Sequence, residues 1–305
     1  MSKLVRAHLS VALVQILYSA NFSIAKQIMP ALVQPYGFIV LRVLPSALFF
    51  FAASYFVKKE NILRGDLLRI VACAVTGVAV NQLLFFKGLN LTVPINGALI
   101  MTTNPILVML FAALFLKEKI SLIKVAGIFS GLTGAIALIL FGKKFSFDSA
   151  GTLGDFYIFL NSVSFALFMI IAKPLMKKYH PLTITKWMFF FGSFMVLPFG
   201  FNDVNSIEWH QFTTASWLAL AFVVVGVTFV AYLLNVIALR ELSPAVVSGY
   251  IYLQPVFAAL FSMIFAEGKP NLLHLICAVL IFTGVYLISK KDLKEKVKGE
   301  HRLTD

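Results

Sequence analysis

Apolar runs of about 20 residues recur along the whole chain, and short polar links separate them. An α-helix needs roughly this length to cross the hydrocarbon core of a bilayer. The pattern therefore predicts an all-α integral membrane protein with ten transmembrane helices. Their expected bounds are Leu9–Met29, Tyr36–Val57, Leu68–Lys87, Ile95–Leu116, Ser121–Phe141, Asp155–Met176, Ile184–Phe201, Trp217–Leu239, Ala245–Phe265 and Leu272–Ser289.

Composition agrees with this pattern. Of the 305 residues, 60% are hydrophobic and 13% are charged, and the mean hydropathy is +0.91, whereas a soluble domain has roughly 45–50% apolar residues. The net charge of +13 does not indicate nucleic acid as a partner, because the basic residues occupy short links, as in membrane proteins. Cys73 and Cys277 lie inside apolar runs, so we expect no disulfide framework, no metal site and no cofactor.

The start of the chain shares one feature with signal peptides, since Lys3 and Arg6 precede the first apolar run. The run Leu9–Met29 is longer than a signal core, and no A-x-A cleavage pattern follows it. We therefore interpret it as the first span.

Two stretches, Gly88–Pro105 and Ala238–Pro255, follow the same plan. Each has a short polar turn, a proline near a helix start, and an apolar run interrupted by an amide-proline pair. Three pairs of landmarks share an offset of 150 residues, namely Pro94 and Pro244, Pro105 and Pro255, and Gly134 and Gly284. A shared offset indicates an internal repeat, and matching interrupted spans in two halves mark the binding site of many transporters.

Lysine and arginine are distributed unevenly between the two sides of the predicted bundle. With the N-terminus in the cytoplasm, the outer side holds only Lys87, Lys143, Lys144 and Lys269. The inner side holds Lys3, Arg6, Lys58, Lys59, Arg64, Arg69, Lys117, Lys119, Lys124, Lys177, Lys178, Lys186, Arg240, Lys290, Lys291, Lys294, Lys296, Lys298 and Arg302. Because cytoplasmic links carry the excess of basic residues, both termini are predicted to be cytoplasmic, in a multi-pass protein of the cytoplasmic (inner) cell membrane.

Five spans per half is an odd number, so the second half must enter the membrane in the opposite sense. We predict one five-helix repeat over residues 7–141, an inverted second repeat over residues 153–289, and a charged cytoplasmic tail over residues 290–305. Secondary transporters use inverted repeats for alternating access. Duplication without transport is the simpler alternative.

Short motifs recur in both halves in the same order. In the first half they are Asn21–Lys26, Pro35, Arg42, Phe86–Leu89, Asn104-Pro105 and Leu116–Lys119. In the second half they are Ala172-Lys173, Ala238-Leu239, Ser243–Ala245, Gln254–Leu260 and Glu267. With these motifs the chain resembles the drug/metabolite transporter superfamily, in particular its ten-helix EamA-type members, from about Ala7 to Ser289.

The resemblance implies a central cavity between the halves, lined by spans 1, 3, 4, 6, 8 and 9, with spans 5 and 10 as scaffold. Two departures are visible. The interval from Pro255 to Glu267 is one residue shorter than that from Pro105 to Glu118. The family's tryptophan in the first span is replaced by Tyr18 or a neighbour. Independently of the resemblance, Gly127, Gly131 and Gly134 form a small-residue face that favours close helix packing in span 5.

Polar side chains inside a span are costly, so each is a candidate for substrate binding. The candidates are Gln15, Tyr18, Asn21, Asn81, Gln82, Thr102, Asn104, Pro105, Asn161, Tyr250, Gln254 and Pro255. Other polar residues within the spans are Asn96, Thr103, Ser164, Asn235 and Tyr252. The alternative is that these groups only tie helices together, at roughly 0.6 kcal/mol for each hydrogen bond.

Asn104 and Gln254 stand out because each precedes a proline. A proline inside a helix leaves the carbonyl four residues earlier without its donor, which here frees the carbonyls of Met101 and Ile251 for a ligand. We expect kinks at Pro105 and Pro255 for the same reason.

Three basic residues fall within spans, and we regard them as gate or charge candidates. Lys26 and Lys173 are repeat mates and are expected near opposite mouths, where they either gate the pathway and attract anions or extend to the headgroups. Arg42 is expected a few residues below the outer surface, where bracing span 1 against span 2 is the alternative role.

The absence of certain residues and motifs from the spans narrows the range of possible functions further. Every acidic residue falls at a span end or in a link, which disfavours a cation antiporter built on a buried carboxylate and favours a neutral, zwitterionic or anionic solute. There are no catalytic residues in a recognisable arrangement, no H-E-x-x-H, no P-loop and no dinucleotide fingerprint.

We therefore predict a secondary transporter, not an enzyme, that acts as a monomer or homodimer and exports a small organic metabolite. An amino-acid-like solute is the leading hypothesis and follows from the resemblance alone. The alternatives are a carrier of nucleotide-like or vitamin solutes, a passive channel, and a membrane enzyme or non-transporting scaffold.

Overall fold

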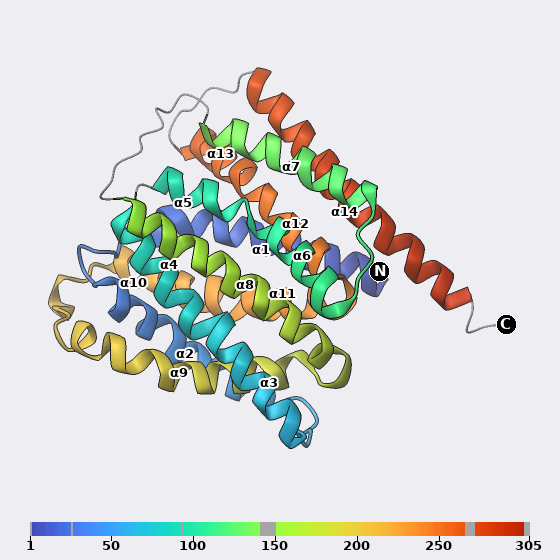
Figure 1. Ribbon diagram of the computed structural model, residues 1–305. Coiled ribbons are helices and arrows are strands. Elements are labelled where there is room, and N and C mark those ends of the chain that lie inside the picture. The colour runs from blue at the N-terminus through green and yellow to red at the C-terminus, as the bar shows by residue number, and fades with distance from the viewer. Residues whose placement is uncertain (1, 26, 93, 141–150, 266–271, 302–305) are drawn as a thin grey trace.

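The computed structural model describes residues 2–301 except residues 26, 93, 141–150 and 266–271. Within these ranges the secondary structure is helical and no strand occurs (Figure 1). The α-helices are α1 (Lys3–Ala25), α2 (Pro35–Ser54), α3 (Arg64–Ala74), α4 (Val80–Leu91), α5 (Pro94–Met101), α6 (Asn104–Leu116), α7 (Leu122–Leu140), α8 (Thr152–Lys178), α9 (Pro181–Asn205), α10 (Thr214–Ala221), α11 (Ala231–Glu241), α12 (Pro244–Gly249), α13 (Leu253–Phe265) and α14 (Leu272–His301).

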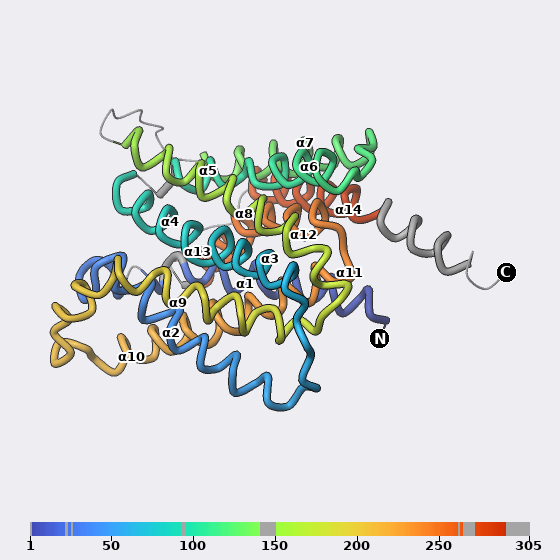
Figure 2. The backbone as a smooth tube through the Cα atoms, turned by 60° about the horizontal axis from the view of Figure 1, so that its bottom comes forward, coloured from blue at the N-terminus to red at the C-terminus, as the bar shows by residue number. Residues whose placement is uncertain are grey.

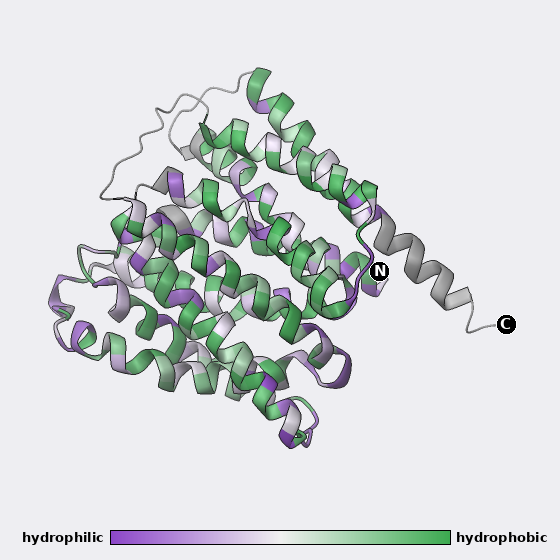
Figure 3. Ribbon diagram, in the orientation of Figure 1, coloured by the Kyte–Doolittle hydropathy of each residue, from purple (hydrophilic) through white to green (hydrophobic). Residues whose placement is uncertain are grey.

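Among the described residues, nine helices are long and apolar enough to cross a membrane. They coincide with the second to tenth predicted spans, whereas α1, which has 23 residues, is not among the nine. Hydrophobic residues make up most of the helices, and many of the hydrophilic residues lie at helix ends and links (Figure 3). Leu48, Leu114 and Leu122 are 71%, 69% and 88% exposed, which suits a surface that faces lipid rather than water.

Helix ends differ from the predicted bounds at both termini of the chain. The first helix begins at Lys3, not Leu9, and ends at Ala25, not Met29. At the other terminus, α14 continues past Ser289 to His301. Apolar length predicts only the part of a helix that lies in hydrocarbon, because a helix can continue beyond the membrane with polar residues.

Spans 4 and 9 were expected as single kinked helices, and in the structure both are broken. Two turn residues separate α5 from α6, and the 3-10 segment η4 (Tyr250–Tyr252) separates α12 from α13. Pro105 occupies the first turn of α6, where a backbone N–H has no partner within the helix and its loss costs little. Pro255 is likewise the third residue of α13.

Two π-helical segments interrupt the third and eighth spans, and the sequence did not predict them. They are η1 (Val75–Ala79), between α3 and α4, and η3 (Phe222–Val230), between α10 and α11. Thr228 fits the wider turn of η3, because its hydroxyl donates to the carbonyl of Val223, five residues earlier, at 2.8 Å. Such segments are often found at functional sites.

The helices pack in pairs, and the pairs form layers. The pair α7 and α14 lies on one side of the molecule, α2 and α9 lie on the opposite side, and α1, α4, α8 and α11 lie between them (Figures 1 and 2). Within the central layer α4 packs on α8 and α1 packs on α11. The predicted glycine face of α7 does lie against α14, since an added Cβ on Gly134 would come within 2.9 Å of the Cys277 carbonyl oxygen.

One end of the bundle collects several links (Figures 1 and 2). The N-terminal end of α1, the α2–α3 link, the α6–α7 link and the α8–α9 turn all lie toward it. Here Asp66, expected at a span end, is buried, and its carboxylate accepts from Lys178 Nζ and from the Tyr179 hydroxyl, both at 3.0 Å. These contacts tie α3 to the end of α8.

Candidate functional site

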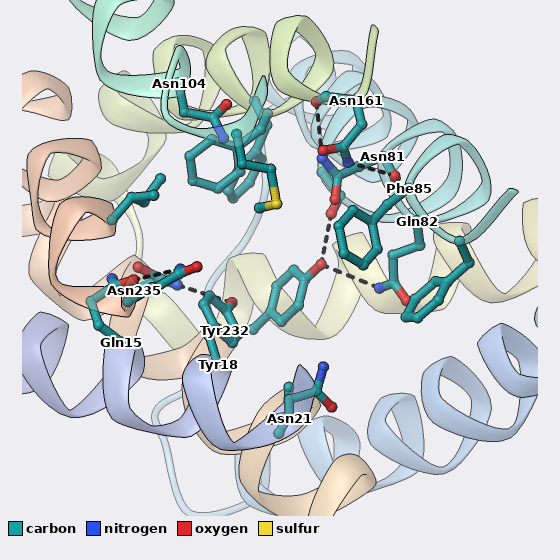
Figure 4. A pocket seen from close by; sticks show the side chains of 18 of the residues that line it. Gln15, Tyr18, Asn21, Asn81, Gln82, Phe85, Asn104, Asn161, Tyr232 and Asn235 are labelled. Carbon is teal, nitrogen blue, oxygen red and sulfur yellow. Dashed lines mark hydrogen bonds between the residues drawn. The ribbon is translucent and has the colours of Figure 1, made fainter. Parts of the chain in front are cut away.

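A cavity of about 120 Å³ lies where the helices of the central layer meet the broken helices (Figure 4). A single water molecule needs roughly 10–15 Å³ on this kind of measure, so the space suits a small organic solute. The lining residues are Gln15, Tyr18, Asn21, Arg42, Gly77, Asn81, Gln82, Phe85, Phe86, Met101, Asn104, Asn161, Phe165, Phe168, Val227, Tyr232, Asn235, Val247, Ile251 and Gln254. They come from both halves of the chain.

On the α1 side, two amides from the second half reach first-half partners. Gln254 Nε2 donates to Gln15 Oε1 at 2.8 Å, and Asn235 Nδ2 donates to the Tyr18 hydroxyl at 3.2 Å. Ser19 Oγ donates to the Gln254 carbonyl at 3.1 Å. These bonds hold α1 against α11 and α13.

On the α4 side, Tyr232 connects the halves. Its hydroxyl donates to the Gly77 carbonyl of η1 at 3.0 Å and accepts from Gln82 Nε2 at 3.2 Å (Figure 4). Asn81 and Asn161 form a reciprocal clasp, in which each side-chain amide donates to the other's backbone carbonyl, at 3.3 and 2.7 Å. The clasp joins α4 to α8, so these two amides are already used as interhelical ties.

Three amide oxygens at the cavity are buried and have no hydrogen-bond partner among the described residues. They are Asn21 Oδ1, Gln82 Oε1 and Asn104 Oδ1. Leaving a buried acceptor unsatisfied costs about 1–3 kcal/mol. Their residues line the cavity, so these are the polar groups whose hydrogen bonding the protein leaves incomplete beside it.

Aromatic and aliphatic side chains form the rest of the wall. Four phenylalanines contribute, namely Phe85, Phe86, Phe165 and Phe168. Met101 and Ile251, whose carbonyls precede the two prolines by four residues, also line the cavity. The site thus combines apolar surface with a few directed polar groups, as small-molecule sites generally do.

Arg42 supplies the one charged side chain among the lining residues. It is 5% exposed, its Nε donates to Thr228 Oγ1 at 3.1 Å, and its guanidinium lies over the rings of Phe38 and Phe86, 5.6 and 5.1 Å from their centroids. These contacts are with α2, α4 and η3, and Tyr18 of α1 lines the same cavity, so the bracing of span 1 against span 2 stays a prediction.

The structure brings together eight of the twelve sequence candidates at the cavity: Gln15, Tyr18, Asn21, Asn81, Gln82, Asn104, Asn161 and Gln254. Thr102 instead donates to its own helix, at the Leu99 carbonyl (2.6 Å), and the Tyr250 hydroxyl lies 2.8 Å from His8 Nδ1. Pro105 lies in the first turn of α6 and Pro255 in the first turn of α13, directly after the helix breaks, and neither proline is part of the cavity wall.

The two lysine candidates have different outcomes. Lys26 lies outside the described residues. Lys173 Nζ donates to the carbonyls of Leu239 and Leu242 at 2.7 and 2.6 Å. It therefore caps the C-terminal end of α11, where a cation is favourable, and does not line the cavity.

Sequence reasoning did not single out Tyr232, the phenylalanines or Gly77. A polar group within a span was the available signal for Tyr232, since it lies inside the eighth predicted span. It is also separated by 150 residues from its partner Gln82, the offset of the repeat. The phenylalanines of the wall had no signal, because the chain has 31 phenylalanines and nothing in the sequence distinguishes these four.

Comparison with known proteins gives the same picture from the whole sequence. The chain is 29% identical over 236 residues to "Uncharacterized transporter YyaM" of Bacillus subtilis, with 76% of each chain covered. It is 23% identical over 290 residues to an "Uncharacterized transporter" of Archaeoglobus fulgidus, which covers 94% of this chain and 98% of the relative. It is also 26% identical over 230 residues, 75% of each chain, to a protein of Streptantibioticus cattleyicolor described as "Probable terminal-alkyne amino-acid exporter".

One solved crystal structure shares the fold, with a TM-score of 0.77 at 16% identity over 94% of this chain and 98% of that one. The sequence profile described as EamA-like transporter family matches residues 5–140 and matches again over residues 152–290. The chain is therefore a multi-pass membrane protein that belongs to the EamA-like transporter family.

Proposed function

We propose that this chain is a secondary transporter whose substrate, a small polar organic solute, binds in the central cavity. The observation that carries the proposal is the cavity itself, which residues from both halves line and where three buried amide oxygens have no described partner. A site shared between two halves can open to either side when the halves move relative to each other. On this proposal the protein is not an enzyme.

The architecture that we propose is ten spans in two inverted five-helix repeats, over residues 7–141 and 153–289. The family profile matches twice, once in each proposed repeat. In the two proposed repeats α4 corresponds to α11, and α1 corresponds to α8. The packed pair α4 and α8 therefore has its counterpart in the packed pair α11 and α1. Counting α1 as a span gives the tenth.

We further propose that both termini and the tail over residues 290–305 are cytoplasmic, in the cytoplasmic membrane. The excess of basic residues supports this orientation. Cysteines at Asn61 and Asn205, both exposed, test it: the Asn205 variant should react with an impermeant thiol reagent from outside, the Asn61 variant only after permeabilisation. The reverse pattern would reject the orientation.

An amino-acid-like solute, moved outward, is the substrate class that we favour. The support is a relative described as an amino-acid exporter and a lining with one cation and no carboxylate among the described residues. Nucleotide-like or vitamin solutes remain the second class. A passive channel would give flux that does not saturate and shows no trans-stimulation.

The test is a solute panel in proteoliposomes that hold the purified chain. We expect saturable flux of at least one small polar solute, and acceleration when the same solute is loaded on the far side. Flux without saturation would support a channel, and no flux of any solute would reject transport. Size-exclusion with light scattering on the same preparation decides between monomer and homodimer.

A further inference from the structure

We propose that Arg42 binds a carboxylate of the transported solute, so that the substrate is a small carboxylic acid or an amino acid. The proposal rests on the function proposed above and names the group that the cavity selects. It starts from the position of the guanidinium, which is buried deep between helices yet forms part of the cavity wall.

The contacts of Arg42 with the protein leave most of its donors free for a ligand. Among the described residues, only its Nε–H has an acceptor, the hydroxyl of Thr228. The two terminal NH₂ groups are the part of a guanidinium that pairs with a carboxylate through two parallel hydrogen bonds. The Phe38 and Phe86 rings lie over the guanidinium and hold its plane without using these donors.

The charge of Arg42 has no counter-charge within the part of the chain that the structure describes. No carboxylate among the described residues forms an ion pair with Arg42, and none lines the cavity. Two acidic residues at helix ends have other partners. Asp66 forms an ion pair with Lys178, and the Asp155 carboxylate accepts hydrogen bonds from Thr92 and Asn96. A buried charge without a partner is costly, so the site gains stability when an anion enters.

The first turns of α6 and α13 add polar groups to the wall beside Arg42. They contribute the side-chain amides of Asn104 and Gln254. Asn21 and Asn104 also line the cavity, and a side-chain amide can both donate and accept hydrogen bonds, so it suits an ammonium or hydroxyl on the same solute. This set matches both ends of a zwitterion, with Arg42 as the anionic selector.

Matched pairs of solutes test the proposal in the purified chain: alanine with alaninamide, and phenylacetate with phenylacetamide. Binding is measured by thermal stabilisation in detergent, and flux by counterflow in proteoliposomes. We expect the acids to bind at least tenfold more tightly than their amides. Arg42→Gln should remove that preference, weakening acid binding roughly ten- to a hundred-fold, and Arg42→Lys should retain part of it.

Asn104→Leu is the matched control, because it alters the same cavity without changing its charge. It should weaken acids and amides alike and leave the preference in place. Should Arg42→Gln fail to fold, Thr228→Val removes the hydrogen bond that orients Arg42 and should reduce the preference at constant charge. A preference that survives both changes at Arg42 and Thr228 would overturn the proposal.

The outcomes separate this inference from transport. If amides are transported as fast as the corresponding acids, the proposed transport stands and the proposed role of Arg42 is overturned. Stabilisation by acids without flux keeps the role of Arg42 and rejects transport. Stabilisation by chloride or phosphate to the same extent as by the acids, or by no acid at all, overturns the proposal.

Discussion

Along the contact between α7 and α14, glycines bring two backbones together, whereas around the central cavity amides and aromatic rings hold the backbones apart. An added Cβ on Gly284 would lie 2.5 Å from the Gly131 backbone nitrogen. At the cavity, by contrast, Tyr232 spans the space between η1 and α11 through its hydroxyl. In lipid, where burial of apolar surface does not drive helices together, close packing and hydrogen bonds must do so.

The two regions also differ in helix regularity. Both α7 and α14 are continuous. Around the cavity, α1 and α8 are continuous as well, but the other four spans are broken at α5–α6 and α12–α13 or widened at η1 and η3. A continuous helix satisfies its own carbonyls and has little to offer a solute. Broken and widened helices present carbonyls and side chains to an interior space, so the contrast separates a scaffold from a binding region.

The largest effect is expected from Gly284→Ala at the α7–α14 contact. Its new methyl group would meet backbone atoms of Gly131 and Gly127, which cannot move as a side chain can, so the helix pair should separate. We expect loss of most monodisperse protein in fluorescence-detected size exclusion. Gly65→Ala is the control, because no atom lies within 4 Å of its added Cβ. Equal recovery of both variants would contradict the scaffold role.

The next effect distinguishes two amides of the cavity. Asn104→Leu should lower transport strongly with little change in melting temperature, because Asn104 Oδ1 has no partner among the described residues to lose. Gln254→Leu removes the 2.8 Å bond to Gln15 and should lower both transport and stability, the latter by about 1–3 kcal/mol. A lower melting temperature with intact transport affinity for Asn104→Leu would show an interhelical tie instead, and would move the site toward Gln15, Tyr18 and Asn21.

A smaller effect is expected at the clasp between α4 and α8. Asn161→Ala leaves the Asn81 carbonyl without its 2.7 Å donor and should cost about 1–3 kcal/mol of stability. Solute affinity should change by less than about threefold, since this amide already has partners. A double-mutant cycle with Asn81→Ala should show strong coupling; additive losses would indicate that the two amides act separately.

The smallest effect concerns a proton gradient. Among its described residues the cavity wall has no carboxylate, which is the usual proton carrier within a membrane. Collapsing the gradient with a protonophore should alter flux of a solute by less than about twofold, which is roughly 0.4 kcal/mol. Concentrative flux that disappears with the gradient would mean that an acidic residue beyond the wall takes part.

Apolar run length and the positions of the prolines predicted the helices well. Nine predicted spans coincide with apolar helices of sufficient length, because a bilayer accepts almost nothing else. The glycine face of α7 was also predictable, since a row of small residues has one common use in membranes. The amides that line the cavity could be proposed from the sequence for the same reason, as polar groups that hydrocarbon penalises.

What the sequence by itself determined is therefore the class of protein, the helical segments and the set of polar groups that need a partner. The tertiary structure alone decided which partner each group has: Asn161 binds α4, Lys173 caps α11, and the Asn104 side-chain oxygen is buried without a partner among the described residues. It also decided that Arg42 forms part of the cavity wall. The physical reason is that the bilayer acts on each helix separately and can be read from composition, whereas a hydrogen bond between helices depends on distances that only their packing sets.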